Sequence, residues 1–276
     1  MNNNNIAILT NQSSGAVLNS FDKTLFAVPR PALERLCDSP VIEIACGDCL
    51  DLMKEMEDKA VSMVLTDPPY DDTTHNGGRF SHEIKFGNVD FESMDIIPLI
   101  KEFLRISLKW VLVFCPIETL GFIKKEYPKE YIRGGIWDRI INSPQISGDR
   151  PAQACEGIAI LHNEGRKIWN GGGNAGIWRA WTERGMKVHP TQKPLKLIRL
   201  LLLDFSNEGD LILDPFFGSA TCAVACYNKN RNFIGFELDR GYYEIGKQRI
   251  MDAQRQQRIE FDKPEGKTTI IEQTTI

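Results

Sequence analysis

The chain lacks the features that mark secreted or membrane proteins. Its first residues, a run of asparagines after Met1, contain no basic segment and no long apolar one, so no secretory signal is expected. The most apolar stretch, residues 195–205, is interrupted by Lys196, Arg199 and Asp204 and is too short to span a bilayer. The chain has 276 residues, 42% hydrophobic and 25% charged, which is ordinary for a soluble protein. We expect a cytoplasmic protein with no membrane partner.

Cysteine is too sparse and too scattered for a disulfide framework, with seven residues in all. Cys46 and Cys49 form a lone CxxC, and a structural zinc site would need a second pair of ligands that the sequence does not offer. We therefore expect no metal. Cys222 and Cys226 share one face of a predicted helix, where we expect small buried hydrophobic residues.

A basic excess, the usual sign of a nucleic-acid-binding protein, is absent too. The chain carries 33 Lys and Arg against 37 Asp and Glu, a net charge of −4. Residues 164–199 are locally basic, which fits phosphate contacts and a solvated surface about equally well. Charge therefore neither supports nor excludes binding to DNA.

Two strand–helix–strand units are present. In the first, an apolar strand at 41–46 leads through a helix to a strand at 61–66. In the second, a strand at 210–213, a helix at 222–228 and a strand at 232–236 follow one another. Such crossovers build parallel sheets, so the sequence predicts an α/β fold. Asp48 and Asp67, which follow the first two strands, should then lie at one edge of the sheet, on neighbouring or near-neighbouring strands.

The second unit lacks the GxGxxG turn of dinucleotide-binding folds. Its first strand ends instead in an acid-first turn, Asp214 to Thr221, and its second strand ends in Glu237. An acid in the latter place holds ribose hydroxyls. The turn suits a ligand with an amine and a small carboxylate better than a pyrophosphate. These properties match S-adenosylmethionine.

The strand at 61–66 ends in Asp67-Pro68-Pro69-Tyr70, a stiff rim with one carboxylate, free carbonyls and one ring. The Asp67 carboxylate and the Pro68 carbonyl can each accept one proton of an amine on a planar group, while Tyr70 stacks on that group. Holding both protons would aim the nitrogen lone pair at an electrophile. The alternative is a strand followed by a Pro-Pro turn with a surface tyrosine.

Two further patterns complete the predicted domain. Residues 136–141 and 156–161 could be paired strands. Residues 195–205 have the period of a helix, for which Thr191 is a candidate N-cap and Pro194 a first-turn residue. The N–H groups at the start of that helix could receive a carboxylate.

Taken together, DPPY, HPTQKP, LDPFFGS and FIGFELD, in this order, resemble the β group of DNA amino-methyltransferases, which modify adenine N6 or cytosine N4. The resemblance covers about residues 41–250 and is nearest to phage-type site-specific enzymes. It implies a seven-stranded, mostly parallel, Rossmann-like sheet with the motifs in permuted order. It also implies S-adenosylmethionine as the cofactor, double-stranded DNA as the substrate and a homodimer as one open arrangement.

The resemblance assigns roles to individual residues. The catalytic set is Asp67, Pro68, Pro69 and Tyr70. The cofactor-binding set is Asp48, Cys49, Thr191, Gln192, Lys193, Asp214, Pro215, Phe216, Gly218, Ser219, Thr221, Glu237 and Asp239. Within it, Asp214 and the turn through Gly218 face the methionine end, Glu237 holds the ribose, and Asp48 and Phe216 lie near the cofactor adenine. The Thr191–Lys193 turn lies near the methionine carboxylate.

An aspartate before Pro-Pro-Tyr favours a flipped adenine in this family, with cytosine N4 as the alternative. An RNA substrate and a nicotinamide-dependent oxidoreductase are weaker rivals. A catalytically silent DNA-binding module is another, because Ala220 replaces the second glycine of the usual GSGT turn. We predict tails at 1–40 and 253–276 and a catalytic domain at 41–252, with a target-recognition insertion within about 120–188.

Overall fold

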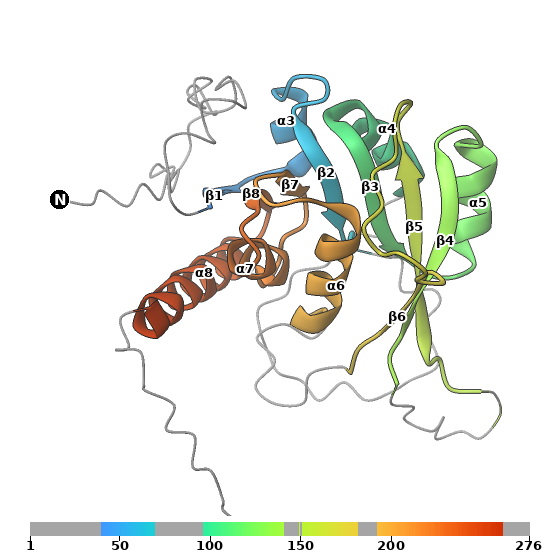
Figure 1. Cartoon of the computed structure of the whole chain (residues 1–276). Helices are drawn as coiled ribbons and strands as arrows, with labels where there is room; N and C mark the ends of the chain where they lie inside the picture. Colours follow the sequence, from blue (N-terminus) through green and yellow to red (C-terminus); the bar gives the residue numbers. More distant parts are fainter. Residues whose placement is uncertain (1–39, 70–95, 141–148, 150, 182–191, 262–276) are drawn as a thin grey trace, which may run out of the picture.

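One mixed sheet organises the chain in the computed structural model, which describes residues 40–69, 96–140, 149, 151–181 and 192–261 (Figure 1). The strands lie in the order β1 (Ile42–Cys46), β8 (Asn232–Glu237), β7 (Leu211–Asp214), β2 (Val61–Thr66), β3 (Ser107–Cys115), β5 (Cys155–His162), β4 (Tyr131–Asp138) and β6 (Ile177–Arg179). The predicted α/β class is confirmed. The described sheet has eight strands where seven were expected, and β6 at its edge is only three residues long.

The first five strands in that order, β1 to β3, all pair in parallel. β5 runs antiparallel to both β3 and β4, which confirms the predicted pairing of the two strands after residue 130. β4 begins at Tyr131, earlier than the predicted start at 136. Because β5 is antiparallel, its first residues reach the edge at which β2 and β3 end.

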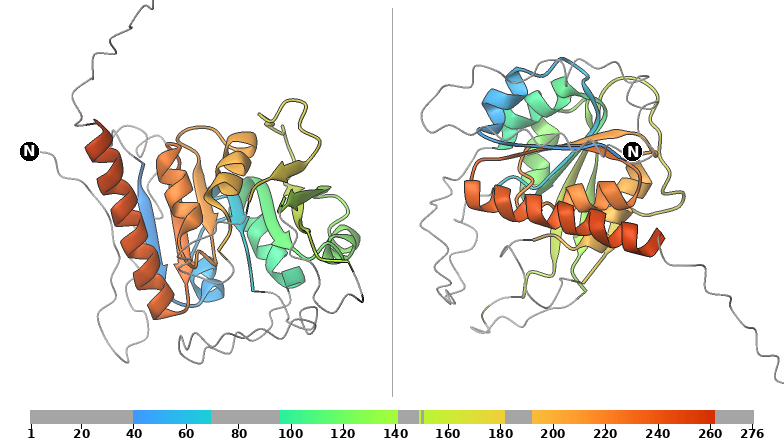
Figure 2. Two further views of the ribbon diagram at one scale, coloured as in Figure 1. Left: turned by 90° about the horizontal axis from the view of Figure 1, so that it is seen from below. Right: turned by 90° about the vertical axis from the view of Figure 1, so that its left-hand side faces the viewer.

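Two layers of helices cover the sheet (Figure 2). On one face lie α3 (Cys49–Lys54), α4 (Ile96–Ile106) and α5 (Thr119–Glu126), and on the other lie α6 (Leu195–Phe205), α7 (Thr221–Asn228) and α8 (Arg240–Phe261). Apolar strands buried on both sides are what a parallel sheet requires. Helix α8 extends into the segment that was predicted as a tail from residue 253. The predicted tail at 1–40 lies almost entirely outside the described residues.

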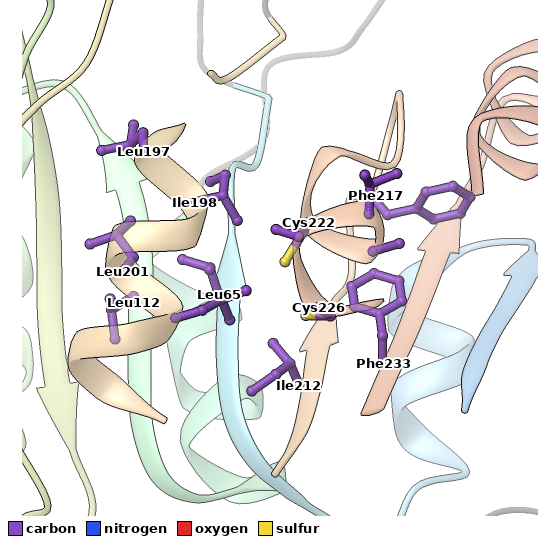
Figure 3. Packing of buried hydrophobic residues seen from close by; sticks show 14 of the residues in the cluster. Leu65, Leu112, Leu197, Ile198, Leu201, Ile212, Phe217, Cys222, Cys226 and Phe233 are labelled. Atoms are coloured by element: carbon purple, nitrogen blue, oxygen red, sulfur yellow. The ribbon is translucent and has the colours of Figure 1, made fainter. Parts of the chain in front are cut away.

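The core on the α6 side is formed by buried side chains of α6, α7 and the strands that these helices cover (Figure 3). Leu197 and Leu201 of α6 lie over Leu65 of β2 and Leu112 of β3, and all four side chains are buried. Nearby, the two cysteines of α7, Cys222 and Cys226, are buried in the same cluster, as predicted from their spacing.

The start of α6 differs from the prediction. Its N-cap is Pro194, whose backbone is extended (φ −62°, ψ 134°) and makes no side-chain cap hydrogen bond. The Pro194 carbonyl accepts the first helical bond, from the N–H of Ile198 at 3.2 Å. Thr191, the predicted N-cap, lies outside the described residues and precedes the observed start by a turn. Because the backbone of Pro194 is extended, the helix does not include this residue, and Leu195 is its first residue.

The strand order decides which motifs meet. β8 and β7 lie between β1 and β2, so the second strand–helix–strand unit is inserted between the two strands of the first. Asp48 and Asp67 therefore lie at the same edge on near-neighbouring strands, with two strands between them. The Asp67 end of β2 is adjacent to the Asp214 end of β7.

Shortening a core side chain of α6 should measure how strongly that helix holds the sheet. Leu201 is fully buried, so Leu201→Ala should lower the free energy of unfolding by about 3 kcal/mol through lost contacts and the cavity that remains. Urea denaturation measures the change. Leu203→Ala, on the same helix but 41% exposed, is the matched control and should cost less than about 1 kcal/mol. Equal losses would contradict the described orientation of α6.

Candidate functional site

The rim after β2 presents a carboxylate at the edge of the sheet. Asp67 is half-buried, with 23% of its side chain exposed, and Pro68 behind it is buried. The two prolines cannot donate to a continuing ladder, so the chain leaves the sheet here. Tyr70, the fourth residue of the predicted catalytic set, lies outside the described residues.

A hydrogen bond joins this rim to the turn after β7. The Thr66 hydroxyl donates to Asp214 Oδ1 at 2.8 Å, and the N–H of Phe216 donates to the same oxygen at 3.2 Å. Burial raises the pKa of Asp214 to about 7, which outweighs the two hydrogen bonds that favour its charged form. Near neutral pH this carboxyl is therefore poised between its charged and neutral forms.

The turn after β7 is hydrogen-bonded to Glu237, the acid at the end of β8. The N–H of Gly218 donates to Glu237 Oε2 at 3.0 Å, and the N–H of Asp239 donates to Oε1 at 2.9 Å. Burial raises the pKa of Glu237 above its usual value, and these backbone donors partly oppose that shift. Gly218 has φ +50°, a conformation that glycine adopts without cost.

Ala220 also has a positive φ, +61°, at the N-cap of α7. Glycine adopts this conformation without cost, whereas a left-handed backbone costs an L-residue such as alanine roughly 1–2 kcal/mol. Two backbone bonds hold the conformation: the Ala220 N–H donates to Phe217 at 2.8 Å, and its carbonyl accepts from Val224 at 3.0 Å. Its methyl group is fully buried, which offsets part of the cost.

The predicted adenine side of the cofactor site lies where β1 and β8 end. Asp48 caps α3, accepting from the N–H of Leu50 at 2.7 Å. The Cys49 thiol is buried in the core, and burial raises its pKa to about 12. Leu238, directly after Glu237, is 70% exposed, and Leu50 is 37% exposed. Exposed apolar side chains beside the acid that is predicted to hold the ribose suit an adenosine group, so these residues fit the expected cofactor.

The described contacts of the other predicted cofactor residues are contacts within the protein. Asp239 caps α8 by accepting from the N–H of Tyr242 at 2.8 Å. The Ser219 carbonyl accepts from Arg249 of α8. Pro215 and Thr221 are buried, and Phe216 and Gln192 are half-buried. Thr191 lies outside the described residues.

Lys193 contacts the carboxylate of Asp67, a member of the predicted catalytic set. Its Nζ is 2.6 Å from Asp67 Oδ2 and 2.8 Å from Glu156 Oε1. Only 10% of the Lys193 side chain and 7% of the Glu156 side chain are exposed. The resemblance had placed Lys193 beside the methionine carboxylate, whereas the structure pairs its ammonium with two acids of the chain.

Sequence reasoning missed three residues of this site: Thr66, Glu156 and Arg139. Arg139 Nη2 lies 2.7 Å from Glu156 Oε2 and so extends the charged chain. A signal for Glu156 was present, because an acid in the otherwise apolar strand CEGIAILH needs a partner when buried. Its position at the catalytic edge follows from the antiparallel direction of β5, which local sequence does not encode.

Cys46 and Cys49 are free thiols. Within the described ranges no three His, Cys, Asp or Glu side chains lie close enough together to hold a metal ion. None of the helices described is long and apolar enough to cross a membrane.

Comparison with known proteins shows what the chain is similar to. The sequence pattern of the DNA methylase family of N6 and N4 enzymes matches residues 119–248, which contain Lys193, Asp214 and Glu237. Type II methyltransferase M.HinfI of Haemophilus influenzae is 27% identical over 242 residues, covering 75% of this chain and 67% of the relative. The chain is therefore similar in sequence to DNA methylases of the N6/N4 family.

Solved methylases have the same fold. The complex of M1.HpyAVI with S-adenosylmethionine matches with a TM-score of 0.62 and 20% identity, covering 76% of this chain and 99% of that one. The cytosine-N4-specific PvuII DNA methyltransferase matches with a TM-score of 0.58 and 16% identity, covering 78% and 92%. The fold is thus that of the S-adenosylmethionine-dependent methylases. The phage-type resemblance stays a prediction.

Substitutions at Ala220 test whether alanine destabilises the turn. Ala220→Gly would relieve the positive φ but lose a buried methyl group and loosen the unfolded chain, and these effects nearly cancel. We expect the free energy of unfolding to change by less than about 1 kcal/mol. Ala220→Val, β-branched and larger, should lower it by about 2 kcal/mol or more. Urea denaturation measures both, and a gain above about 2 kcal/mol for glycine would mark alanine as a defect.

Proposed function

We propose that the chain is a DNA methyltransferase that moves the methyl group of S-adenosylmethionine to N6 of an adenine flipped out of double-stranded DNA. One observation carries the proposal: the Thr66–Asp214 hydrogen bond at 2.8 Å, which joins the Asp67-Pro68-Pro69 rim to the acid-first turn. A site for an amine and a site for a cofactor therefore share one edge, on adjacent parallel strands. Ligands of open α/β sheets bind at this edge.

The cofactor side would be held by residues of β7, β8 and the turns that follow them. Asp214 would face the methionine ammonium, Glu237 would accept the ribose hydroxyls, and Leu238 and Phe216 would flank the adenine. S-adenosylmethionine supplies a methyl group on a positively charged sulfur. Phe217, buried behind the turn, keeps the turn rigid.

The base side would be held by the rim. Asp67 and the Pro68 carbonyl would each accept one hydrogen bond from the target amine, Pro69 would keep the rim stiff, and Tyr70 would stack on the base. As the nitrogen bonds to the methyl carbon, the carbon–sulfur bond breaks and its electrons stay on sulfur. The nitrogen then gives up one proton, for which the Asp67 carboxylate is the adjacent acceptor.

The choice of adenine rests on Asp67. An aspartate before Pro-Pro-Tyr, rather than serine or asparagine, favours adenine in the resembling family, with cytosine N4 as the alternative. Target recognition would fall within about 120–188, a range whose described part includes α5, β4, β5 and β6. These elements continue the sheet beyond β3, so recognition would be built onto the catalytic domain itself.

Transfer of labelled methyl from S-adenosylmethionine to unmethylated genomic DNA tests the proposal. We expect the label in N6-methyladenine after enzymatic digestion and nucleoside analysis by mass spectrometry. Label in N4-methylcytosine would retain the activity and overturn the choice of base. Label in RNA but not in DNA would overturn the substrate, and no label with intact cofactor binding would overturn the activity.

The control is Asp67→Ala, which removes the proposed acceptor of the target amine. Turnover should fall about a thousandfold, because positioned hydrogen bonds supply this order of rate enhancement. Calorimetric affinity for S-adenosylmethionine should stay close to that of the wild type. Loss of both together would show that Asp67 serves the cofactor rather than the base.

Affinity for S-adenosylmethionine should depend on the ionisation of Asp214. With a pKa of about 7, the Asp214 carboxyl is mostly neutral below that pH and offers the ligand's ammonium no charge. As pH rises from about 5.5 to about 7, its ionised fraction and hence the affinity should increase about tenfold. Isothermal titration calorimetry measures this. Asp214→Asn should bind weakly and nearly independently of pH; an unchanged pH dependence in that variant would contradict the assignment.

A further inference from the structure

Four charged side chains form a continuous row beneath the rim. Asp67 contacts Lys193 at 2.6 Å, Lys193 contacts Glu156 at 2.8 Å, and Glu156 contacts Arg139 at 2.7 Å. Acids and bases alternate, so the row as a whole carries no net charge. Its members come from four places in the sequence: the end of β2, the segment before α6, the start of β5 and the residue after β4.

The inner part of the row is closed off by aromatic rings. Lys193 Nζ lies 4.9 Å from the centroid of the Phe114 ring and 5.9 Å from that of Trp137. The guanidinium of Arg139 lies 5.1 Å from the same Trp137 ring. These rings attract cations on their faces and exclude water, which strengthens every charge contact in the row.

Burial of Lys193 is costly, and its two acids compensate for much of that cost. Burial alone would lower the pKa of Lys193, but Asp67 and Glu156 outweigh it, so its pKa is raised. Burial would likewise raise the pKa of Glu156, but Lys193 and Arg139 outweigh it and the pKa is lowered. Both side chains are therefore charged near neutral pH, and removing Lys193 would take one cationic partner from each of Asp67 and Glu156.

We infer that Lys193 is a positioning residue for Asp67 rather than a cofactor ligand, and that Glu156, held by Arg139, fixes Lys193 in that role. The inference rests on the proposed function, because it assigns Asp67 to the target amine. It differs from the resemblance, which placed Lys193 beside the methionine carboxylate. The ammonium binds Asp67 Oδ2 from within the protein and thereby sets the plane in which the carboxylate meets a base.

Positioning matters here because Asp67 would hold the target amine, and meet the proton it loses, through a hydrogen bond of fixed geometry. Two prolines follow it, so the backbone is stiff, but the side chain can still rotate about its own bonds. A contact of 2.6 Å to a buried ammonium removes that freedom before any substrate arrives. An acceptor that is already oriented loses no free energy in ordering when the amine binds, and misplacement by about 1 Å can cost about a hundredfold in rate.

Lys193→Met tests the inference, since it keeps the length of the side chain and removes the charge. We expect kcat for methyl transfer to DNA to fall about a hundredfold, with the calorimetric Kd for S-adenosylmethionine and the KM for DNA within about threefold of wild type. Lys101→Met, at an exposed lysine of α4, is the matched control and should leave all three constants unchanged. A tenfold weaker Kd for the cofactor with kcat retained would overturn the inference.

A second variant separates positioning from charge balance and guards against a single variant that fails to fold. Lys193→Met combined with Glu156→Gln removes one positive and one negative charge together, which leaves the half-buried Asp67 and Arg139 balanced in charge. Thermal unfolding should recover towards wild type. If Lys193 positions Asp67, kcat stays low in the double variant. If Lys193 only balances charge, kcat recovers along with stability, and the inference fails.

Failure of the inference and failure of the proposed function have different signatures. If the wild-type chain transfers no methyl to DNA, the proposed function fails whatever Lys193 does. If wild type is active, Asp67→Ala is inactive and Lys193→Met retains its kcat, the proposed function stands and only the role of Lys193 is wrong.

Discussion

The parallel pairing of β2 with β7 is the constraint on which the site depends. Met63 lies opposite Ile212 and Val64 opposite Leu213, so the two strands end side by side. Their last residues, Thr66 and Asp214, are 148 positions apart in the chain yet share a hydrogen bond. The predicted base rim and the predicted cofactor turn meet because of this register. The crossovers and both helical layers keep it in place.

Three features near that edge are individually unfavourable. An alanine with φ +61° opens α7, a lysine is buried between two acids, and a carboxyl with a pKa of about 7 lies under the turn. Each would be unfavourable in an isolated segment, and each is sustained by neighbours from other elements. Departures of this kind are expected where function needs a fixed geometry.

The strands, helices and motifs near this edge were predictable because each leaves a local mark. Apolar runs ending in acids predicted β2 and β7, and the period of residues 195–205 predicted α6. The order of the strands was not predictable, since nothing in 41–46 or 61–66 records that β8 and β7 lie between them. The partner of Lys193 was missed for the same reason: Asp67 is 126 positions away, and only the assembled sheet brings the two together.

The contact between Lys193 and Asp67 holds the segment before α6 against the predicted catalytic rim. Pro194 begins the helix, and the buried face of that helix, including Leu197 and Leu201, ties it to β2 and β3. The ammonium is thus delivered from a rigid element packed on the same strands whose ends it serves. A displacement of α6 would therefore disturb the contact between Lys193 and Asp67. Packing of the core and geometry of the base site are in this way one property of the fold.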